Sequence, residues 1–254
     1  MKQSKSVVMG VFFIFLLLVL SLLLLVRLQA ANHLPRTAAA SPTPFFAPLP
    51  VTASVSAAPE ETEEPESDLP RIDITGWQYT LASASHPIGD YAPPALTTLE
   101  GGHQFDSRAA VSLQNFIDGA RREGLSVCLS SAYRNYSDQS YLYNRKVQQL
   151  GGDYEAAARI VLPPGTSEHQ LGLCADITDQ FYEVKTAALE NTALFQWMQE
   201  HCAEYGFILR YPADKEDITG VIYEPWHFRY VGEEAAAYIT EHGLCLEEFL
   251  ELYE

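Results

Sequence analysis

The chain has 254 residues, of which 47% are hydrophobic, and its formal net charge at pH 7 is −17. This length allows one sizeable domain with its own core, together with additional segments. Nucleic-acid binding requires a basic face, so an acidic chain of this kind predicts no nucleic-acid partner, and its charge bears on solubility rather than on fold.

Residues 7–26 form an apolar run that only one glycine and one serine interrupt. As a helix with a rise of about 1.5 Å per residue, the run would cover roughly 30 Å, the thickness of the bilayer core. A cleaved signal peptide usually has a shorter apolar region of about 7–15 residues, so an uncleaved anchor over residues 1–27 is favoured. Lys2 and Lys5 before the run predict a cytoplasmic N-terminus, with the rest of the chain beyond the membrane.

Residues 28–70 are rich in proline and alanine and include an acidic run over residues 60–66. Such a segment cannot bury enough apolar surface to fold, so we expect a disordered or extended tether. A degraded pro-segment is the alternative interpretation. In either case the folded domain is expected over residues 71–254.

Apolar spacing and chain-breaking residues predict the elements of this domain. The first helix is expected between an Asp106 cap and a Gly124 stop. The further helices are predicted over residues 137–150, 154–161, 192–205, 232–242 and 245–252, and the strands over residues 125–131, 171–178, 207–210 and 226–231. Helices in blocks around a few short strands predict an α+β fold, with a small, mainly antiparallel sheet flanked by helices.

Four cysteines occur, at positions 128, 174, 202 and 245, and none has the CxxC spacing of a thiolate zinc site. An exported domain permits disulfides, but the sequence does not choose among the possible pairings. Cys128 and Cys174 lie in apolar, strand-like runs, so we expect both to be small buried thiols.

Two histidines stand beside acidic residues in a way that suggests chemistry. His169 precedes the predicted strand that carries Asp176, and His227 follows Glu224 by three residues. A catalytic zinc ion takes three protein ligands and keeps a fourth position for water, while a further carboxylate moves the proton. These four residues can supply such a set. Taken alone, however, each spacing is more often structural, and no HExxH helix is present.

Three motifs resemble those of the VanY-type D-alanyl-D-alanine carboxypeptidases. Residues 167–176 match SxHxxGxAxD, residues 224–227 match ExWH, and residues 131–134 match SxYR. The resemblance covers residues 80–243, and relatives of the group include the L,D-carboxypeptidases, lysostaphin and the hedgehog signalling domain. It implies a hedgehog/D-Ala-D-Ala peptidase-like fold with one zinc ion per catalytic domain. We expect Cys174 to fill a variable position of the first motif.

The resemblance also implies a role for each matching residue. The implied zinc ligands are His169, Asp176 and His227. Glu224 resembles the general base, and Arg134 resembles the residue that binds the terminal carboxylate of the substrate, which a planar guanidinium can pair with through two hydrogen bonds. Gln139 and Ser167 match positions that form hydrogen bonds with the substrate in the family.

These roles predict a zinc-dependent D,D-carboxypeptidase that removes the C-terminal D-alanine from peptidoglycan stem peptides. The alternatives are an L,D-carboxypeptidase that acts on tetrapeptide stems and a non-catalytic module that binds zinc and wall peptide. The expected location is the bacterial cell membrane, spanned once by the N-terminal helix, with the catalytic domain outside the cytoplasm. The sequence leaves the oligomeric state open.

Overall fold

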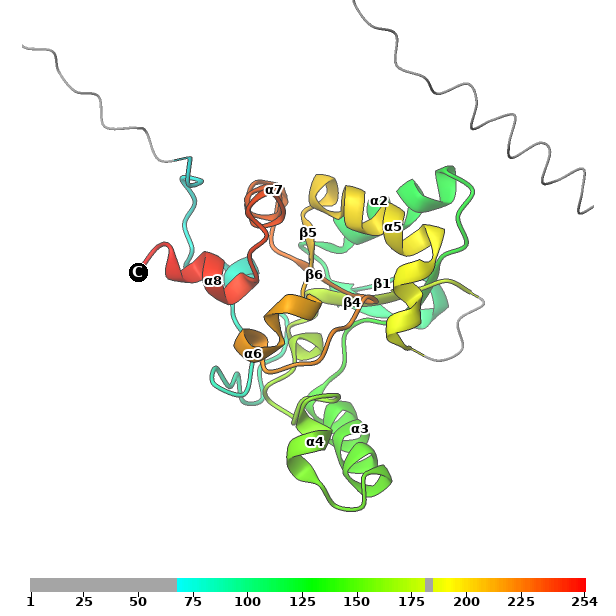
Figure 1. Ribbon diagram of the computed structural model, residues 1–254, viewed down its shortest axis with the longest axis vertical. Coiled ribbons are helices and arrows are strands. Elements are labelled where there is room, and N and C mark those ends of the chain that lie inside the picture. The colour runs from blue at the N-terminus through cyan, green and yellow to red at the C-terminus, as the bar shows by residue number, and fades with distance from the viewer. Residues whose placement is uncertain (1–67, 181–184) are drawn as a thin grey trace, which may run out of the picture. The chain divides into compact units, whose positions relative to one another are not determined.

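The computed structural model describes residues 68–180 and 185–254 (Figure 1). Residues 1–67, which hold the predicted anchor and most of the predicted tether, lie outside these ranges. Within the described ranges, no helix is both long enough and apolar enough to cross a membrane.

A four-stranded antiparallel sheet lies at the centre of the described domain, with the strand order β3–β4–β6–β5. The strands are β3 (Cys128–Ser131), β4 (Cys174–Thr178), β6 (His227–Tyr230) and β5 (Phe207–Leu209). A second sheet pairs β1 (Leu96–Thr98) with β2 (Gln104–Asp106). With helices gathered around these sheets (Figure 1), the α+β prediction is confirmed. The sequence did not predict β1 and β2, which have three residues each.

The described helices lie where the sequence predicts them, although their ends shift, except for the short α6, which the sequence did not predict. They are α2 (Ala110–Arg122), α3 (Tyr136–Gln149), α4 (Tyr154–Ala158), α5 (Ala193–His201), α6 (Glu216–Thr219), α7 (Glu233–His242) and α8 (Leu246–Glu251). The start of α3 is set by Asn135, whose side chain accepts a hydrogen bond from the backbone of Asp138 at 2.9 Å. The predicted Asp106 cap of the first helix is wrong. Asp106 ends β2, where its carboxylate binds Arg108 instead.

One face of the central sheet enters the apolar core. Side chains alternate along a strand, which sends Ala175 and Ile177 of β4 and Phe228 of β6 into this core. Helices α2 and α5 lie side by side over this face (Figure 1). Phe116 of α2 stacks on Phe207 of β5 with the ring centroids 5.4 Å apart. Because these side chains are buried, the residues next to them along each strand must point to the opposite face of the sheet.

The opposite face of the sheet carries polar side chains. Asp176 in β4 lies directly across from Ser131 in β3 and from His227 in β6, so these residues form a row over three strands. The pairing of β3 with β4 shifts between Leu129 and Ser131, an irregularity of the kind that redirects a side chain at the edge of a functional site. The row is the foundation of the candidate site.

All four cysteines are free. The expectation of a buried thiol is confirmed for Cys174, whereas Cys128 at the start of β3 is only partly buried. The fold of the described residues therefore rests on packing and hydrogen bonding and not on a disulfide among these cysteines.

Gly172 forms the turn between the short 3-10 helix η3 (Glu168–Leu171) and β4, with a φ of +69°. Its carbonyl oxygen accepts a hydrogen bond from the backbone of Asp106 at 2.9 Å. A Cβ at this position would lie 3.0 Å from Pro93 Cγ and 3.2 Å from the Asp106 nitrogen. Only glycine satisfies both the left-handed conformation and this close approach.

We expect Gly172→Ala to lower the free energy of unfolding by about 2–4 kcal/mol, because strain at positive φ adds to a clash with backbone. Gly151→Ala is the matched control, since Gly151 has a similar φ of +68° but an added Cβ would meet nothing within 4 Å. The control should lose only about 1 kcal/mol. Urea unfolding of both variants tests this, and equal losses would show that the close approach does not matter.

Candidate active site

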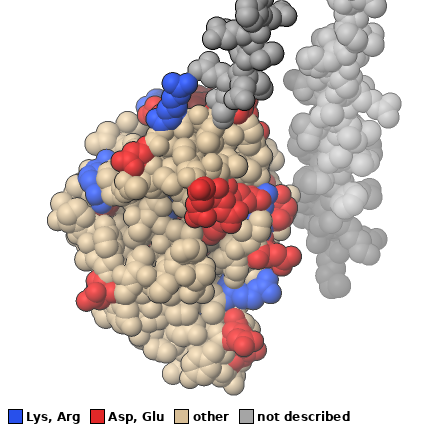
Figure 2. Space-filling model, turned by 90° about the vertical axis from the view of Figure 1, so that its left-hand side faces the viewer, with Lys and Arg blue, Asp and Glu red and all other residues tan. Residues whose placement is uncertain are grey.

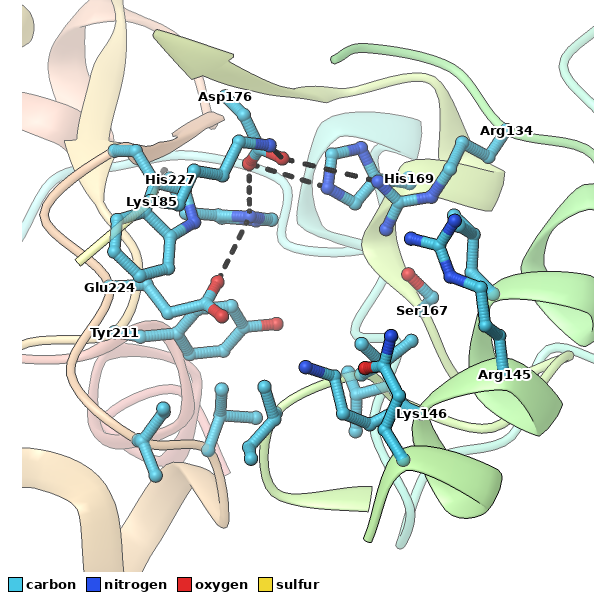
Figure 3. A pocket seen from close by; sticks show the side chains of 18 residues that line it. Arg134, Arg145, Lys146, Ser167, His169, Asp176, Lys185, Tyr211, Glu224 and His227 are labelled. Carbon is cyan, nitrogen blue, oxygen red and sulfur yellow. Dashed lines mark hydrogen bonds and ion pairs between the residues drawn. The ribbon is translucent and has the colours of Figure 1, made fainter. Parts of the chain in front are cut away.

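The three predicted metal ligands come together from three different elements. His169 lies in η3, Asp176 in β4 and His227 in β6, and each is 3% exposed. Asp176 Oδ1 lies 3.4 Å from His169 Nε2 and 3.1 Å from His227 Nδ1 (Figure 3). The two imidazole rings are perpendicular, with their centroids 5.0 Å apart. Two ring nitrogens and a carboxylate oxygen therefore face a common point.

The second nitrogen of each imidazole faces an oxygen atom. His169 Nδ1 donates to the carbonyl oxygen of Ala132 at 2.6 Å, which leaves Nε2 as the nitrogen that faces Asp176. In His227 the Nδ1 atom faces Asp176, while Nε2 lies on the far side of the ring, 3.6 Å from Glu168 Oε2. Zinc-binding histidines are held in this way, with one nitrogen toward the metal and the other toward a carbonyl or carboxylate. Two imidazoles and one carboxylate are also a usual catalytic donor set, so these residues fit zinc.

Cys174 lies beside the same two histidines. One potential ligand atom from each of His169, Cys174 and His227 lies within 4.8 Å of the others. The thiol is fully buried and is not among the residues that line the pocket described below, whereas Asp176 is. A catalytic metal needs a position open to substrate, so the set that contains Asp176 fits better.

The position of Cys174 in the motif also differs from the expectation. Counted along SxHxxGxAxD from Ser167, Cys174 stands at the alanine and not at a variable position. Burial raises the pKa of this thiol, but His169 and His227 lower it to about 7. The substitution therefore adds a polarisable group behind the metal site.

Asp176 is ionised at neutral pH. Burial opposes ionisation, but Lys185 and His169 hold the pKa of this carboxyl well below its ordinary range. Lys185 Nζ lies 2.5 Å from Asp176 Oδ2, and Arg134 Nη1 lies 4.0 Å from the same oxygen. An ionised carboxylate is what metal binding requires. Lys185 carries no sequence signal, since it stands outside all three motifs.

Glu224 is placed beside His227 by a turn with Pro225 and Trp226 at its corner. The backbone nitrogen of His227 donates to the carbonyl oxygen of Glu224 at 3.0 Å, and Glu224 Oε2 lies 3.6 Å from His227 Nδ1. The side chain is nearly buried, which raises the pKa of Glu224 to about 7. A carboxyl group that changes its protonation near neutral pH is suited to proton transfer.

Arg134 follows β3 and is held by two neighbouring side chains. Its Nη1 donates to Ser131 Oγ at 2.8 Å, and its Nε donates to Gln139 Oε1 at 2.9 Å. Gln139 is fully buried, and its amide nitrogen donates to the carbonyl oxygen of Leu162. The position of Gln139 therefore supports a role in holding Arg134 and not the predicted contact with substrate. Ser167 lines the pocket, as a contact with substrate requires.

A pocket of about 340 Å³ opens in front of these residues, a size within the range of small-molecule sites. Its basic lining residues are Arg134, Arg145, Lys146 and Lys185 (Figure 3). Its apolar lining comes mainly from Leu142, Ile160, Val161, Leu162, Val221 and Ile222. By contrast, acidic side chains gather near the middle of the molecular face in Figure 2. A cationic pocket in an acidic chain predicts an anionic ligand.

Tyr211 is a pocket residue that the sequence did not single out. Its ring lies 4.8 Å from that of His227, and its hydroxyl points into the pocket (Figure 3). Burial raises the pKa of Tyr211, so the hydroxyl stays protonated at neutral pH and can donate a hydrogen bond. No local motif marks Tyr211, because it follows β5 and comes near His227 only when β5 pairs with β6.

Comparisons with known proteins agree with this geometry. Residues 102–233 match the family model described as VanY, D-alanyl-D-alanine carboxypeptidase. A D-alanyl-D-alanine carboxypeptidase of Enterococcus faecalis strain V583 is 35% identical over 215 residues, which cover 80% of this chain and 78% of that protein.

Two solved structures are also similar. One is a VanY D,D-pentapeptidase from a VanB-type vancomycin-resistance cassette in complex with Zn(II), with 38% identity and a TM-score of 0.62, covering 69% of this chain and 99% of that one. The other is the LdcB LD-carboxypeptidase, with 38% identity and a TM-score of 0.55, covering 65% of this chain and 76% of that one.

Proposed function

This chain belongs to the VanY family of D-alanyl-D-alanine carboxypeptidases, and we propose that it removes the C-terminal D-alanine from peptidoglycan stem peptides by zinc-dependent hydrolysis. The observation that carries the proposal is the convergence of His169 Nε2, Asp176 Oδ1 and His227 Nδ1 at the wall of a pocket. The same pocket presents Glu224 and Arg134. Metal ligands, a base and a carboxylate-binding cation are the parts that a metallo-carboxypeptidase needs.

Zinc bound by the three ligands supplies Lewis acidity at the scissile carbonyl and makes water a nucleophile near neutral pH. Glu224 accepts the proton of the attacking water and returns it to the nitrogen of the leaving D-alanine. Arg134, held by Ser131 and Gln139, pairs with the terminal carboxylate and so sets which peptide bond reaches Glu224. The Tyr211 hydroxyl can donate to the oxygen that gains negative charge.

The dependence on metal tests the proposal directly. We expect a chelator to lower D-alanine release from a synthetic stem pentapeptide at least about 100-fold, and added zinc to restore it, because both Lewis acidity and the nucleophile are lost without the ion. The measurement is free D-alanine over time, with the metal content determined in parallel. Release that persists after the metal is shown to be removed would contradict the proposal.

The similarity to the LdcB LD-carboxypeptidase gives a second candidate, which is action on tetrapeptide stems. The two differ in the residue that precedes the terminal D-alanine, so release from pentapeptide and tetrapeptide stems separates them. We expect faster release from the pentapeptide, in line with the D,D-carboxypeptidases among the relatives. Release from neither stem by a zinc-loaded chain would indicate the non-catalytic binding module.

We further propose that the chain spans the bacterial cell membrane once, with the catalytic domain outside the cytoplasm. The apolar run over residues 7–26, the lysines before it and the location of peptidoglycan support this. In untreated cells the full chain should be found in the membrane fraction. External protease applied to intact protoplasts should digest the catalytic domain. A soluble chain that lacks its first residues would instead indicate a cleaved signal peptide.

A further inference from the structure

A buried cluster of charges lies on the side of His227 away from the pocket. At its centre is Glu168, which is fully buried and whose Oε1 accepts hydrogen bonds from Arg210 Nε at 2.7 Å and Arg229 Nη1 at 2.6 Å. Arg210 also forms two hydrogen bonds with Glu247, at 2.7 and 2.6 Å. The two carboxylates and two guanidinium groups balance in formal charge. Of the buried side-chain polar atoms of these four residues, one has no hydrogen-bond partner.

That atom is the second oxygen of Glu168. Among the described residues, the buried side-chain polar atoms without a hydrogen-bond partner are Glu168 Oε2 and His227 Nε2. They lie 3.6 Å from each other, just beyond hydrogen-bonding distance. A buried polar group left unpaired is costly, and here one hydrogen bond satisfies both atoms.

We propose that Glu168 is the positioning residue of His227, accepting a hydrogen bond from its Nε2–H and thereby presenting the Nδ1 lone pair to the metal. The inference rests on the proposed function, because it concerns the zinc site of that function. Glu168 acts through His227 and not on the substrate. The residue adjacent to Glu168 is the ligand His169, so one turn of η3 supplies a ligand and also orients another.

The charge cluster gives Glu168 the rigidity that this role needs. Burial opposes its ionisation, but Arg210 and Arg229 hold its pKa below the ordinary range, so the carboxylate stays an acceptor. Both arginines are almost fully buried, and Arg229 is further fixed by the carbonyl oxygens of Gln78 and Thr80 at 2.9 and 2.8 Å. Held on Oε1 from two directions, Glu168 has its Oε2 directed at His227.

Glu168→Gln reverses the polarity of this contact. The amide oxygen of glutamine must face the arginine donors, which leaves its amide NH₂ toward His227 Nε2. Two donors cannot pair, so the imidazole moves its proton to Nδ1, the nitrogen that the metal needs. We therefore expect the zinc dissociation constant of the variant to rise about 10- to 100-fold. Competition with a chromophoric chelator measures it without reference to activity.

Two matched variants separate this effect from a general disturbance of the charge cluster and from an effect of the nearby thiol. Glu247→Gln removes a carboxylate from the same cluster but does not touch His227, so it should lower the melting temperature and leave zinc affinity unchanged. Cys174→Ala removes the thiol near both histidines and restores the alanine of the motif, and it should also leave zinc affinity within a few fold. Loss of affinity in either control that equals the loss in Glu168→Gln would overturn the proposal.

Because Glu168→Gln can also prevent folding, the wild-type full chain provides a second test. Imidazole ¹⁵N–¹H NMR of the zinc-loaded protein should show a slowly exchanging proton on His227 Nε2, assigned by its absence in His227→Ala. A proton on Nδ1, or rapid exchange at Nε2, would overturn the inference. A wild-type chain that binds no zinc would refute the proposed function instead, whereas zinc binding and D-alanine release with unchanged affinity in Glu168→Gln would refute only the inference.

Discussion

Glu224→Gln is expected to lower kcat for D-alanine release by about 10²- to 10⁴-fold, the usual contribution of a general acid–base residue. The amide keeps the size of the side chain but cannot accept and return a proton. Because the carboxylate lies beside the ligands and not among them, zinc content and KM should stay close to those of the wild type. Steady-state kinetics together with metal analysis measure all three quantities.

Glu200→Gln is the matched control, since Glu200 is exposed at the end of α5. It should have no effect on turnover. If Glu224→Gln kept turnover within a few fold of the wild type, Glu224 would not be the base. If it lost zinc together with turnover, the carboxylate would instead support metal binding.

Arg134→Gln is expected to lower kcat/KM by between about 30- and 3,000-fold, because it removes one partner of a charge-assisted pair and leaves the substrate carboxylate unpaired. The loss should appear largely as a raised KM, with zinc affinity unchanged. Arg134→Lys should recover only part of it, since an ammonium lacks the planar fork of the guanidinium.

A stem pentapeptide with a C-terminal amide provides the control for this prediction. It lacks the negative charge that Arg134 is proposed to bind, so the wild type and Arg134→Gln should cleave it at similar, low rates. If the variant lost as much activity on the amide as on the acid, Arg134 would act on the fold or the metal site and not on the carboxylate. Circular dichroism and zinc titration would then distinguish those two cases.

The sequence alone was enough to propose which residues carry the chemistry. His169, Asp176, His227 and Glu224 all stand in short motifs that resemble those of the VanY family. The α+β class was also predictable, because the spacing of apolar residues reflects the local period of each helix and strand. These features depend on neighbours within a few positions along the chain.

Contacts between distant segments were not predictable in this way. Asp176 meets His227 because β4 and β6 pair in one particular register, and Glu168 meets Arg229 only once the strands are in place. Gln139 was expected to contact substrate, yet the fold buries it behind Arg134. No spacing along the chain encodes such contacts, since strand register and burial depend on the packing of the whole core.

The sequence by itself thus determined the proposed donor set, the proposed base and the proposed carboxylate-binding arginine of this protein, since each is a choice of residue type at a motif position. Only the tertiary structure decided which imidazole nitrogens face Asp176, which side chains hold Arg134, and that Glu168 lies behind His227. The physical reason is that hydrogen-bond direction and ion pairing are properties of positions in space. Packing of the sheet on α2 and α5 sets those positions.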